Sequence, residues 1–482
     1  MTARPTPVSA GGCNTWTGAG GSANWSVAAN WSLGTPVNGQ ALCFPVHVSP
    51  QLVLVDDIAG LSVNNITNLG NYTVTGQSLT VAGALTGDNF EMFLQNPIVL
   101  SGVVTVVGFS FDGPIHGTGS LDVLGPWPVS VNSSLNNFSG GVTVDGPTNG
   151  LLDDRGSLGT GIVAVQSGGV LAVDNTIVDN PLTLAGAGAV PRQYALYCLG
   201  GSQLNGHITL TADTTVFDYD PPVGPAIVPG RTCRLNGGIS GDFQLTLEEK
   251  SDGIDPGPGW ILTGTNTYTG GTRVSGPDGG GSYVIGGGPT PLGTGPVTIT
   301  AGTPSDLFST GTVGDVTLDA PAGVLSASDG ENPGTLTTGR LTLNNGALSS
   351  EIDAPTQSTP ANSVVVSTGP VTLDGAALVL DLRYQPPVGK QFTLVRNTSG
   401  SPIAGTFAGL PEGATFAAGG VRFSITYRGN GGQDAVVTVL ATVPPVPTTG
   451  ASPDWALGLL LSGLGVTCLL VGRRRGRADP VG

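Results

Sequence analysis

The sequence predicts an all-β protein that is built as an elongated solenoid. Three observations predict it: glycine supplies 79 of the 482 residues, apolar and polar residues alternate in short runs, and parts of the chain repeat one another. Average proteins contain only about 7% glycine. Alternation with a period of two is typical of strands that bury one face. No sustained helical periodicity precedes the C-terminal apolar run, so we expect many strands joined by tight turns and a single C-terminal transmembrane helix.

Alternating runs recur along the chain and are separated by glycine, asparagine or proline, as expected for short strands. The clearest are Ile208/Leu210/Ala212, Phe243/Leu245/Leu247, Val297/Ile299, Leu341/Leu343, Val371/Leu373, Leu378/Leu380/Leu382 and Phe423/Ile425/Tyr427.

The charge of the chain excludes one class of partner. Charged residues make up only 10% of the sequence, and the net charge is −16. Up to Thr449 there are 13 Lys+Arg against 31 Asp+Glu. A body this acidic cannot neutralise phosphates, so we expect no binding to nucleic acid. The mean hydropathy is positive at +0.19, which argues against a disordered chain.

Internal repeats favour a solenoid over stacked sandwiches, because each rung of a solenoid buries its apolar face only against its neighbours. The nine residues N-N-F-S-G-G-V-T-V at 136–144 align with N-T-Y-T-G-G-T-R-V at 266–274. Leu-Gly-Thr-Gly and a further strand follow each copy, at 158–161 and 292–295. These residues resemble the autotransporter-associated β-strand repeat. The resemblance implies a right-handed parallel β-helix of the pectin-lyase-like kind.

Five regions follow from these patterns. They are an N-terminal cap containing Trp and Cys (1–50), a β-helix with the repeats (51–320), a C-terminal β-helix segment (321–442), a proline-rich linker (443–454), and an apolar anchor with an arginine tail (455–482).

Three of the six tryptophans, Trp16, Trp25 and Trp31, lie near the N-terminus. An open solenoid end exposes unpaired backbone groups, so we interpret this segment as a packed cap. The alternative is an exposed tryptophan platform for carbohydrate.

Four of the five cysteines form two groups, Cys13 with Cys43 and Cys198 with Cys233, whereas Cys468 lies in the C-terminal apolar run. Even numbers in an exported protein favour disulfides, and pairing within each group is the local choice. Four unpaired buried thiols are the alternative. The spacing lacks the CxxC pairs of a zinc site, so we expect no metal and no cofactor.

The C-terminus indicates a membrane anchor. An apolar run of 18 residues extends from Trp455 to Gly472, and the cluster Arg473, Arg474 and Arg475 follows it. This length is at the short end of what spans a bilayer, and the arginines are expected to stay cytoplasmic.

The pentapeptide Val446-Pro447-Thr448-Thr449-Gly450 precedes this run. It resembles the LPXTG cell-wall sorting motif, with Val446 in place of leucine. The resemblance implies a sortase-like partner that cuts between Thr449 and Gly450 and attaches the body to the cell envelope. A plain membrane anchor is the alternative.

The N-terminus carries no apolar core of a signal peptide between Met1 and Gly12. Because a C-terminal helix cannot export a large body alone, we expect that the true start lies upstream or that the signal was omitted. An intracellular protein with a fortuitous tail is the alternative.

Candidate catalytic residues are few. The most enzyme-like are Asp112, His116, Asp153 and Asp154. Glycoside hydrolysis needs two facing carboxylates, and adjacent residues on a strand point to opposite faces. We therefore predict a structural, adhesin-like rod on the cell surface, with a surface, a glycan or another cell as its partner. A surface-anchored polysaccharide lyase or glycoside hydrolase is the alternative function.

Overall fold

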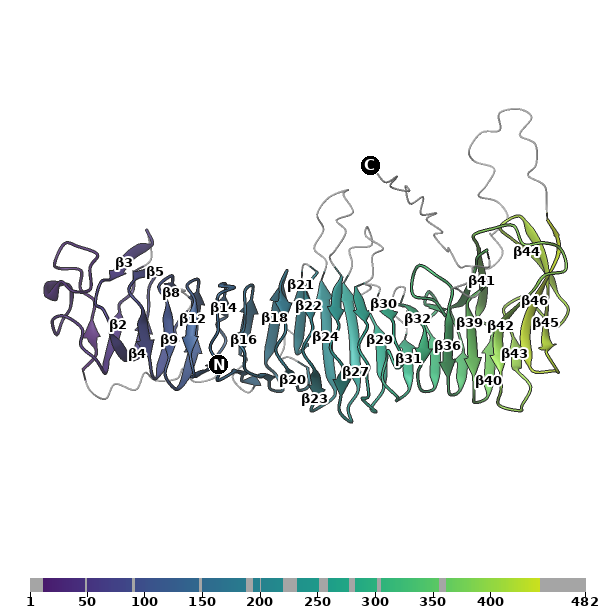
Figure 1. Cartoon of the computed structure of the whole chain (residues 1–482), viewed down its shortest axis with the longest axis horizontal. Coiled ribbons are helices and arrows are strands. Elements are labelled where there is room, and N and C mark those ends of the chain that lie inside the picture. The colour runs from purple at the N-terminus through teal and green to yellow at the C-terminus, as the bar shows by residue number, and fades with distance from the viewer. Residues whose placement is uncertain are drawn as a thin grey trace, which may run out of the picture.

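The computed structural model describes residues 12–47, 50–88, 92–146, 150–187, 194–199, 201–219, 232–250, 259–276, 282–300, 305–354 and 361–442. They form an elongated rod in which short strands follow one another from end to end (Figure 1). The predicted all-β class is confirmed, since strands dominate the described ranges and η1 (Ala28–Asn30) is only a short 3-10 turn. No helix within them could cross a membrane. The predicted span at 455–472 and the sorting pentapeptide lie outside the described residues.

Four sheets build the rod, and the longest, here called the long sheet, extends over almost its whole length. Its sixteen strands are β3 (Leu52–Asp56), β5 (Tyr72–Gly76), β8 (Met92–Leu94), β11 (Phe109–Phe111), β14 (Val129–Val131), β16 (Leu151–Asp154), β18 (Val170–Asp174), β21 (Leu196–Leu199), β24 (Thr214–Tyr219), β27 (Leu245–Lys250), β29 (Thr272–Ser275), β31 (Val297–Thr300), β34 (Val316–Asp319), β37 (Leu341–Leu343), β40 (Val371–Asp374) and β43 (Ala404–Thr406).

The other three sheets complete the rungs. The N-terminal sheet holds β1 (Asn14–Thr15), β2 (Gln40–Phe44), β4 (Ser62–Asn68), β6 (Leu79–Val81), β7 (Ala84–Gly87), β9 (Ile98–Leu100), β10 (Val103–Val107), β12 (Ile115–Gly117), β13 (Ser120–Val123), β15 (Val142–Val144), β17 (Val163–Val165), β20 (Leu182–Leu184), β23 (Ile208–Leu210) and β26 (Ile239–Ser240). The middle sheet holds β19 (Ile177–Val178), β22 (Gln203–Leu204), β25 (Cys233–Leu235), β28 (Trp260–Leu262), β30 (Ser282–Gly286), β32 (Ser305–Ser309), β35 (Val324–Ser326), β38 (Ala347–Ile352) and β41 (Ala377–Leu382). The C-terminal sheet holds β33 (Gly311–Thr312), β36 (Thr335–Thr338), β39 (Val364–Ser367), β42 (Gln391–Asn397), β44 (Thr415–Ala418), β45 (Val421–Gly429) and β46 (Asp434–Thr442).

Except in the antiparallel meander at the C-terminal end, strands of successive rungs pair in parallel, which is the arrangement of a parallel β-helix. In the long sheet Val297, Val316, Leu341 and Val371 stack in register, and all four are buried. The alternation therefore buries one apolar column along the axis and leaves the intervening residues outside. These ladders cross residue 320 without a break, so the predicted segments 51–320 and 321–442 form one solenoid.

One predicted strand is shorter than its sequence pattern. β27 begins at Leu245, and Phe243 lies in the preceding bend with 38% of its surface exposed. The Ser240-Gly-Asp-Phe turn connects two sheets here. The alternating sequence pattern therefore begins in the turn, before the strand itself begins.

The first repeat copy forms a corner of the solenoid. The side chain of Asn136 bridges three rungs, because its Oδ1 accepts from the Ile115 amide at 2.7 Å and its Nδ2 donates to the Ser157 carbonyl at 2.8 Å. The Phe138 side chain is fully buried beside it. Buried backbone groups at a corner have no ladder partner, so the asparagine satisfies one donor and one acceptor that would otherwise be left unpaired.

The second copy repeats this geometry. Asn266 Oδ1 accepts from the Ile239 amide at 2.9 Å, and its Nδ2 donates to the Pro291 carbonyl at 2.6 Å. Tyr268 is fully buried, like Phe138. The repeated motif thus encodes a corner of the fold.

The N-terminal cap is a packed structure, as predicted. Trp16, Trp25 and Trp31 are all at most 4% exposed, and their rings meet edge to face and continue onto Phe44. Because these rings are buried, the alternative of an exposed tryptophan platform is wrong. Ser26 ties the cap to the first rung through Asp57, whose Oδ1 accepts the Ser26 amide at 2.8 Å and whose Oδ2 accepts its hydroxyl at 2.6 Å.

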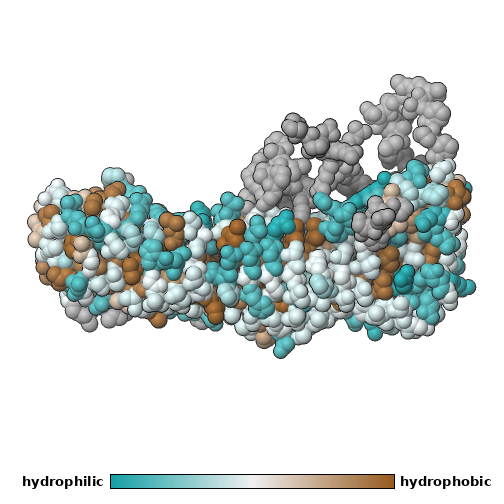
Figure 2. Space-filling view, viewed as in Figure 1, coloured by the Kyte–Doolittle hydropathy of each residue, from teal (hydrophilic) through white to brown (hydrophobic). Residues whose placement is uncertain are grey.

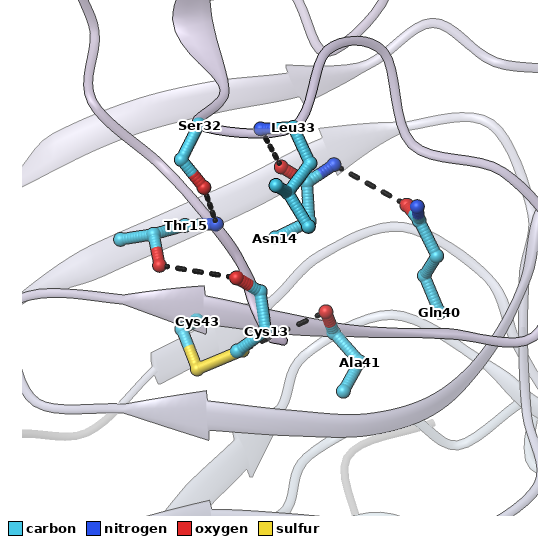
Figure 3. Close-up of a disulfide and its surroundings, with 8 residues drawn as sticks. All are labelled: Cys13, Asn14, Thr15, Ser32, Leu33, Gln40, Ala41 and Cys43. Atoms are coloured by element: carbon cyan, nitrogen blue, oxygen red, sulfur yellow. Dashed lines mark hydrogen bonds between the residues drawn. A yellow bond between two sulfur atoms is a disulfide. The ribbon is translucent and has the colours of Figure 1, made fainter. Parts of the chain in front are cut away.

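Both predicted disulfides are present. Cys13–Cys43 joins the residue just before β1 to β2, with hydrogen bonds around Asn14 and Thr15 holding the same segment (Figure 3). Cys198–Cys233 joins β21 of the long sheet to β25 of the middle sheet. The alternative of four free thiols is therefore wrong.

The C-terminal end is closed by a change of strand direction. β42 pairs antiparallel with β46, β46 with β45, and β45 with β44, whereas the other ladders between the described strands are parallel. A meander of this kind ends the stack of rungs, as solenoid ends require.

A candidate ligand-binding face on the long sheet

The four predicted catalytic residues lie at different positions on two sheets. Asp112 follows β11 of the long sheet and is partly exposed, whereas Asp154, at the end of β16, is fully buried. His116 is on β12 of the N-terminal sheet, where its Nδ1 lies 2.8 Å from Asn137 Oδ1. Asp153 is on β16 in register with Ser130, and its side chain lies outside the described part of the structure. The structure does not bring Asp112, His116 and Asp154 together around one point.

The role of Asp154 is local. Its Oδ1 accepts the Gly156 amide at 3.1 Å inside the corner after β16. A buried carboxylate that accepts from the chain two residues on is typical of an Asx-type turn. This contact gives Asp154 a structural role in that corner.

Asp112 belongs instead to a row of polar side chains on the outside of the long sheet. Its Oδ1 accepts from the Ser110 hydroxyl at 3.0 Å and from Asn132 Nδ2 at 2.8 Å. One rung further along, Arg155 lies at the next position of the row, and its Nε is 3.6 Å from Asp174 Oδ2. We call these five residues the polar ladder.

Beside the polar ladder lies a cluster of three aromatic rings. Tyr197 on β21 is in register with Ala172 on β18 and with Phe217 on β24. Tyr194 precedes β21, and its ring is 4.9 Å from that of Phe217 and 5.1 Å from that of Tyr197. The planes of these two pairs differ by only 12° and 28°. We call Tyr194, Tyr197 and Phe217 the aromatic cluster.

The aromatic cluster is separate from the core of the solenoid. It packs on Val170 and Ala172, which point outward from β18 and form their own small apolar group with Tyr194 and Tyr197. Phe217 is 9% exposed, and both tyrosines keep a larger exposed fraction. The long sheet therefore carries an apolar platform on its outer face, across three consecutive rungs.

The rest of the outer face is different in character. From β27 onward, Glu248 and Ser275 continue the position of Phe217, and the neighbouring outward column holds Thr246, Arg273, Thr298, Thr317 and Thr342. Threonine is the ordinary occupant of a solvated strand surface. Figure 2 shows the visible side of the rod as mostly hydrophilic or intermediate, with small separate apolar areas.

Two carboxyl groups elsewhere, the half-buried Asp306 and the buried Glu351, lie in packed surroundings. Burial raises the pKa of Asp306 to about 6, although the Val324 amide donates to its Oδ1 at 3.0 Å. Burial also raises the pKa of Glu351, and Arg383 opposes this from 3.2 Å. Arg383, which follows β41, also donates to the Glu331 carbonyl, and this hydrogen bond ties the 328–334 loop to the end of β41.

In the described ranges, no group of three or more His, Cys, Asp or Glu side chains is placed to hold a metal ion. No protein-family model matches the chain, and no curated protein sequence matches it.

Sequence reasoning missed the aromatic cluster. Tyr194 and Tyr197 lie in Y-A-L-Y-C-L and read as ordinary members of an alternating strand. The detectable signal is that Tyr197 and Phe217 occupy an outward column that holds Ser110, Ser130 and Ser275 on other rungs. This comparison requires the register between rungs, which the uneven turn lengths conceal.

Proposed function

We propose that this chain is a structural, adhesin-like protein of the cell surface, built on a right-handed parallel β-helix of the autotransporter-associated repeat kind. The observation that carries the proposal is the long rod itself, closed at both ends and crossed by two disulfides. Disulfides persist in oxidising compartments, which supports a place outside the cytosol. A rod of stacked rungs projects a surface away from its attachment point.

The proposed attachment is the C-terminal region, with residues 455–472 as a transmembrane helix and 446–450 as a sorting signal read by a sortase-like enzyme. The last described strand, β46, lies at the C-terminal end of the rod (Figure 1). Attachment there leaves the N-terminal cap as the most distant part. The same arrangement holds for a plain membrane anchor.

Surface labelling of intact cells tests the location. Cells that express the chain from its native locus are treated with a membrane-impermeant protease, and the rod is followed by immunoblotting. We expect the rod to be digested while a cytoplasmic marker protein survives. A protease-resistant rod that becomes sensitive only after lysis contradicts surface display.

Mass spectrometry of the mature C-terminus tests the mode of attachment. Sortase processing predicts a terminal peptide that ends at Thr449 and is linked to an envelope amine. A Thr449→Ala variant should then remain unprocessed, with Thr442→Ala as the matched control outside the pentapeptide. Recovery of residues 455–472 in the mature protein identifies a plain membrane anchor.

A deletion strain tests the role in contact. Attachment to surfaces and to other cells should fall relative to the parent, and expression of the intact chain should restore it. Unchanged adhesion and biofilm formation in the deletion strain count against the adhesin-like role.

A further inference from the structure

The outer face of the long sheet between β11 and β24 combines two kinds of surface. The polar ladder holds Ser110, Asp112, Asn132, Arg155 and Asp174 in hydrogen-bonding or ionic contact. The aromatic cluster follows on the next rungs. Six strands about 4.8 Å apart separate the ends of this face by about 24 Å.

The aromatic cluster fits a ligand with flat apolar faces. A partly exposed aromatic ring offers a π-face or an edge on which C–H groups pack, and such contacts add about 0.5–1.5 kcal/mol beyond area burial. The rings of Tyr194 and Phe217 are parallel within 12°, with their centroids 4.9 Å apart, so they form a stack of defined orientation. Pyranose rings present C–H groups of this kind on one or both faces.

The polar ladder fits the hydroxyl groups of the same ligand. Carboxylate oxygens accept from hydroxyls, the Asn132 amide both donates and accepts, and the Arg155 guanidinium donates. Arg155 and Asp174 are 57% and 35% exposed, so both can reach a ligand in solvent. The Asn132 amide and the Asp112 carboxylate lie 2.8 Å apart, so they place a donor and an acceptor side by side for the vicinal hydroxyls of a sugar.

The charge balance selects among glycans. Asp112 and Asp174 face one cation, Arg155, which is already paired with Asp174. The whole chain carries a net charge of −16. An anionic polysaccharide, nucleic acid or anionic lipid would meet like charge on this surface.

We propose that this face binds a neutral glycan chain that runs along the rod, with its sugar rings stacked on the aromatic cluster and its hydroxyls bound by the polar ladder. The inference rests on the proposed function as a surface-contact protein and names the partner of that contact. A sugar chain repeats at regular intervals, as the rungs of the solenoid do, so it can lie along the sheet.

Binding by the full chain in mild detergent tests the inference. The probes are the soluble neutral polysaccharides dextran, a β-1,3-glucan and a galactomannan, with polygalacturonate and heparin as anionic counterparts. We expect measurable affinity for at least one neutral probe and none for the anionic probes at physiological salt.

Variants then locate the contact. Tyr197→Ala should weaken binding about tenfold, the loss expected for one stacked ring at about 1.4 kcal/mol. Tyr197→Phe should bind within about threefold of the parent, because it keeps the ring. Asn132→Ala should weaken binding without changing the thermal unfolding of the rod, and Thr342→Ala, on the same outer face, is the matched control.

Three results overturn the inference. They are no affinity for any neutral probe, affinity for the anionic probes alone, and unchanged affinity in a Tyr194→Ala/Tyr197→Ala double variant whose circular dichroism matches the parent. Retention of an apolar peptide in place of glycans would assign the aromatic cluster to protein contact and also overturn it.

The glycan-binding inference and the proposed function can fail independently of each other. A chain that is displayed on cells and promotes adhesion but binds no neutral glycan contradicts only this inference. A chain that binds a neutral glycan in vitro but stays inside the cell contradicts the proposed function alone.

Discussion

Asn136 and Asn266 occupy equivalent corners of the solenoid, and each one hydrogen-bonds backward to the rung before it and forward to the rung after it. These two contacts explain why the repeat opens with asparagine. Aspartate could accept from the preceding amide but could not donate to the following carbonyl.

The first prediction concerns these corners. Asn136→Ala leaves the Ile115 amide and the Ser157 carbonyl without their partner, at a cost of about 1–3 kcal/mol for each buried group. Hydrogen exchange should therefore accelerate around β12 and the corner after it. Asn137→Ala is the neighbouring control, since Asn137 contacts only the partly exposed His116 ring through its side chain among the described contacts. Equal exchange in the two variants would contradict the corner role.

The second prediction concerns the glycine of the following Leu-Gly-Thr-Gly. Gly293 has φ +69°, and a Cβ there would lie 2.5 Å from the Tyr268 carbonyl oxygen and 2.9 Å from its ring. Gly293→Ala should lower the midpoint of thermal unfolding well below that of Gly375→Ala. Gly375 shares the positive φ, at +75°, but has open space around it, so its cost is only the backbone strain of about 1–2 kcal/mol. Similar midpoints for the two variants would show that crowding by Tyr268 plays no part.

The third prediction concerns the cap. Replacement of Cys13 and Cys43 by serine removes a link with a sequence separation of 30, which is expected to cost about 2–4 kcal/mol. Limited proteolysis should then cut first near Trp16 and Trp31, ahead of the rest of the rod. The same replacement at Cys198 and Cys233 should leave the cap resistant. Uniform cleavage in both variants would argue against a cap that opens independently.

The fourth prediction concerns pH. Burial raises the pKa of Asp56 to about 7 from 3.8, and the nearby charge of Asp57 adds to the rise, while the Ile58 amide opposes it. The folded state therefore holds a proton that the unfolded chain releases near pH 4. The contribution of Asp56 to stability is complete below about pH 4 and is lost as pH rises toward 7 and beyond.

Asp56→Asn tests this sign. Asparagine keeps the acceptor for the Ile58 amide at 3.1 Å but cannot ionise. Denaturant unfolding followed by the cap tryptophans should show a smaller loss of stability between pH 4 and 8 in this variant than in the parent. Asp57→Asn is the contrasting change: hydrogen bonds from Ser26 outweigh burial and lower the pKa of Asp57. An unchanged pH profile in Asp56→Asn would assign the dependence to another group.

The sequence was most informative where one residue determines a backbone geometry. Alternation identified the class, and the two asparagine-led copies identified a repeat. The structure shows that each copy forms a corner, where asparagine and glycine make contacts that other residues cannot. Cysteine spacing gave the two disulfides, since each pair bridges strands that approach within about 6 Å between Cα atoms, at 5.9 and 6.1 Å.

The candidate binding face could not be predicted in the same way. Asp112 is a catalytic candidate in the sequence because it lies shortly before His116. In the structure His116 is on another sheet, and Asn132 is the residue that contacts Asp112. The spatial neighbours of an outward residue lie one rung away, at separations that vary with each turn. Tyr197 and Phe217 therefore become one surface only when the register is known.

The parallel ladders have a mechanical consequence. Their hydrogen bonds point along the rod, so tension applied between its two ends loads the contacts between rungs in series. Such a rod yields at its weakest rung and lengthens stepwise, absorbing work over a long extension instead of breaking at one threshold. The Cys198–Cys233 link spans a sequence separation of 35, and that stretch cannot be drawn out. The covalent link thus sets a stop midway along a molecule that otherwise behaves as an extensible tether.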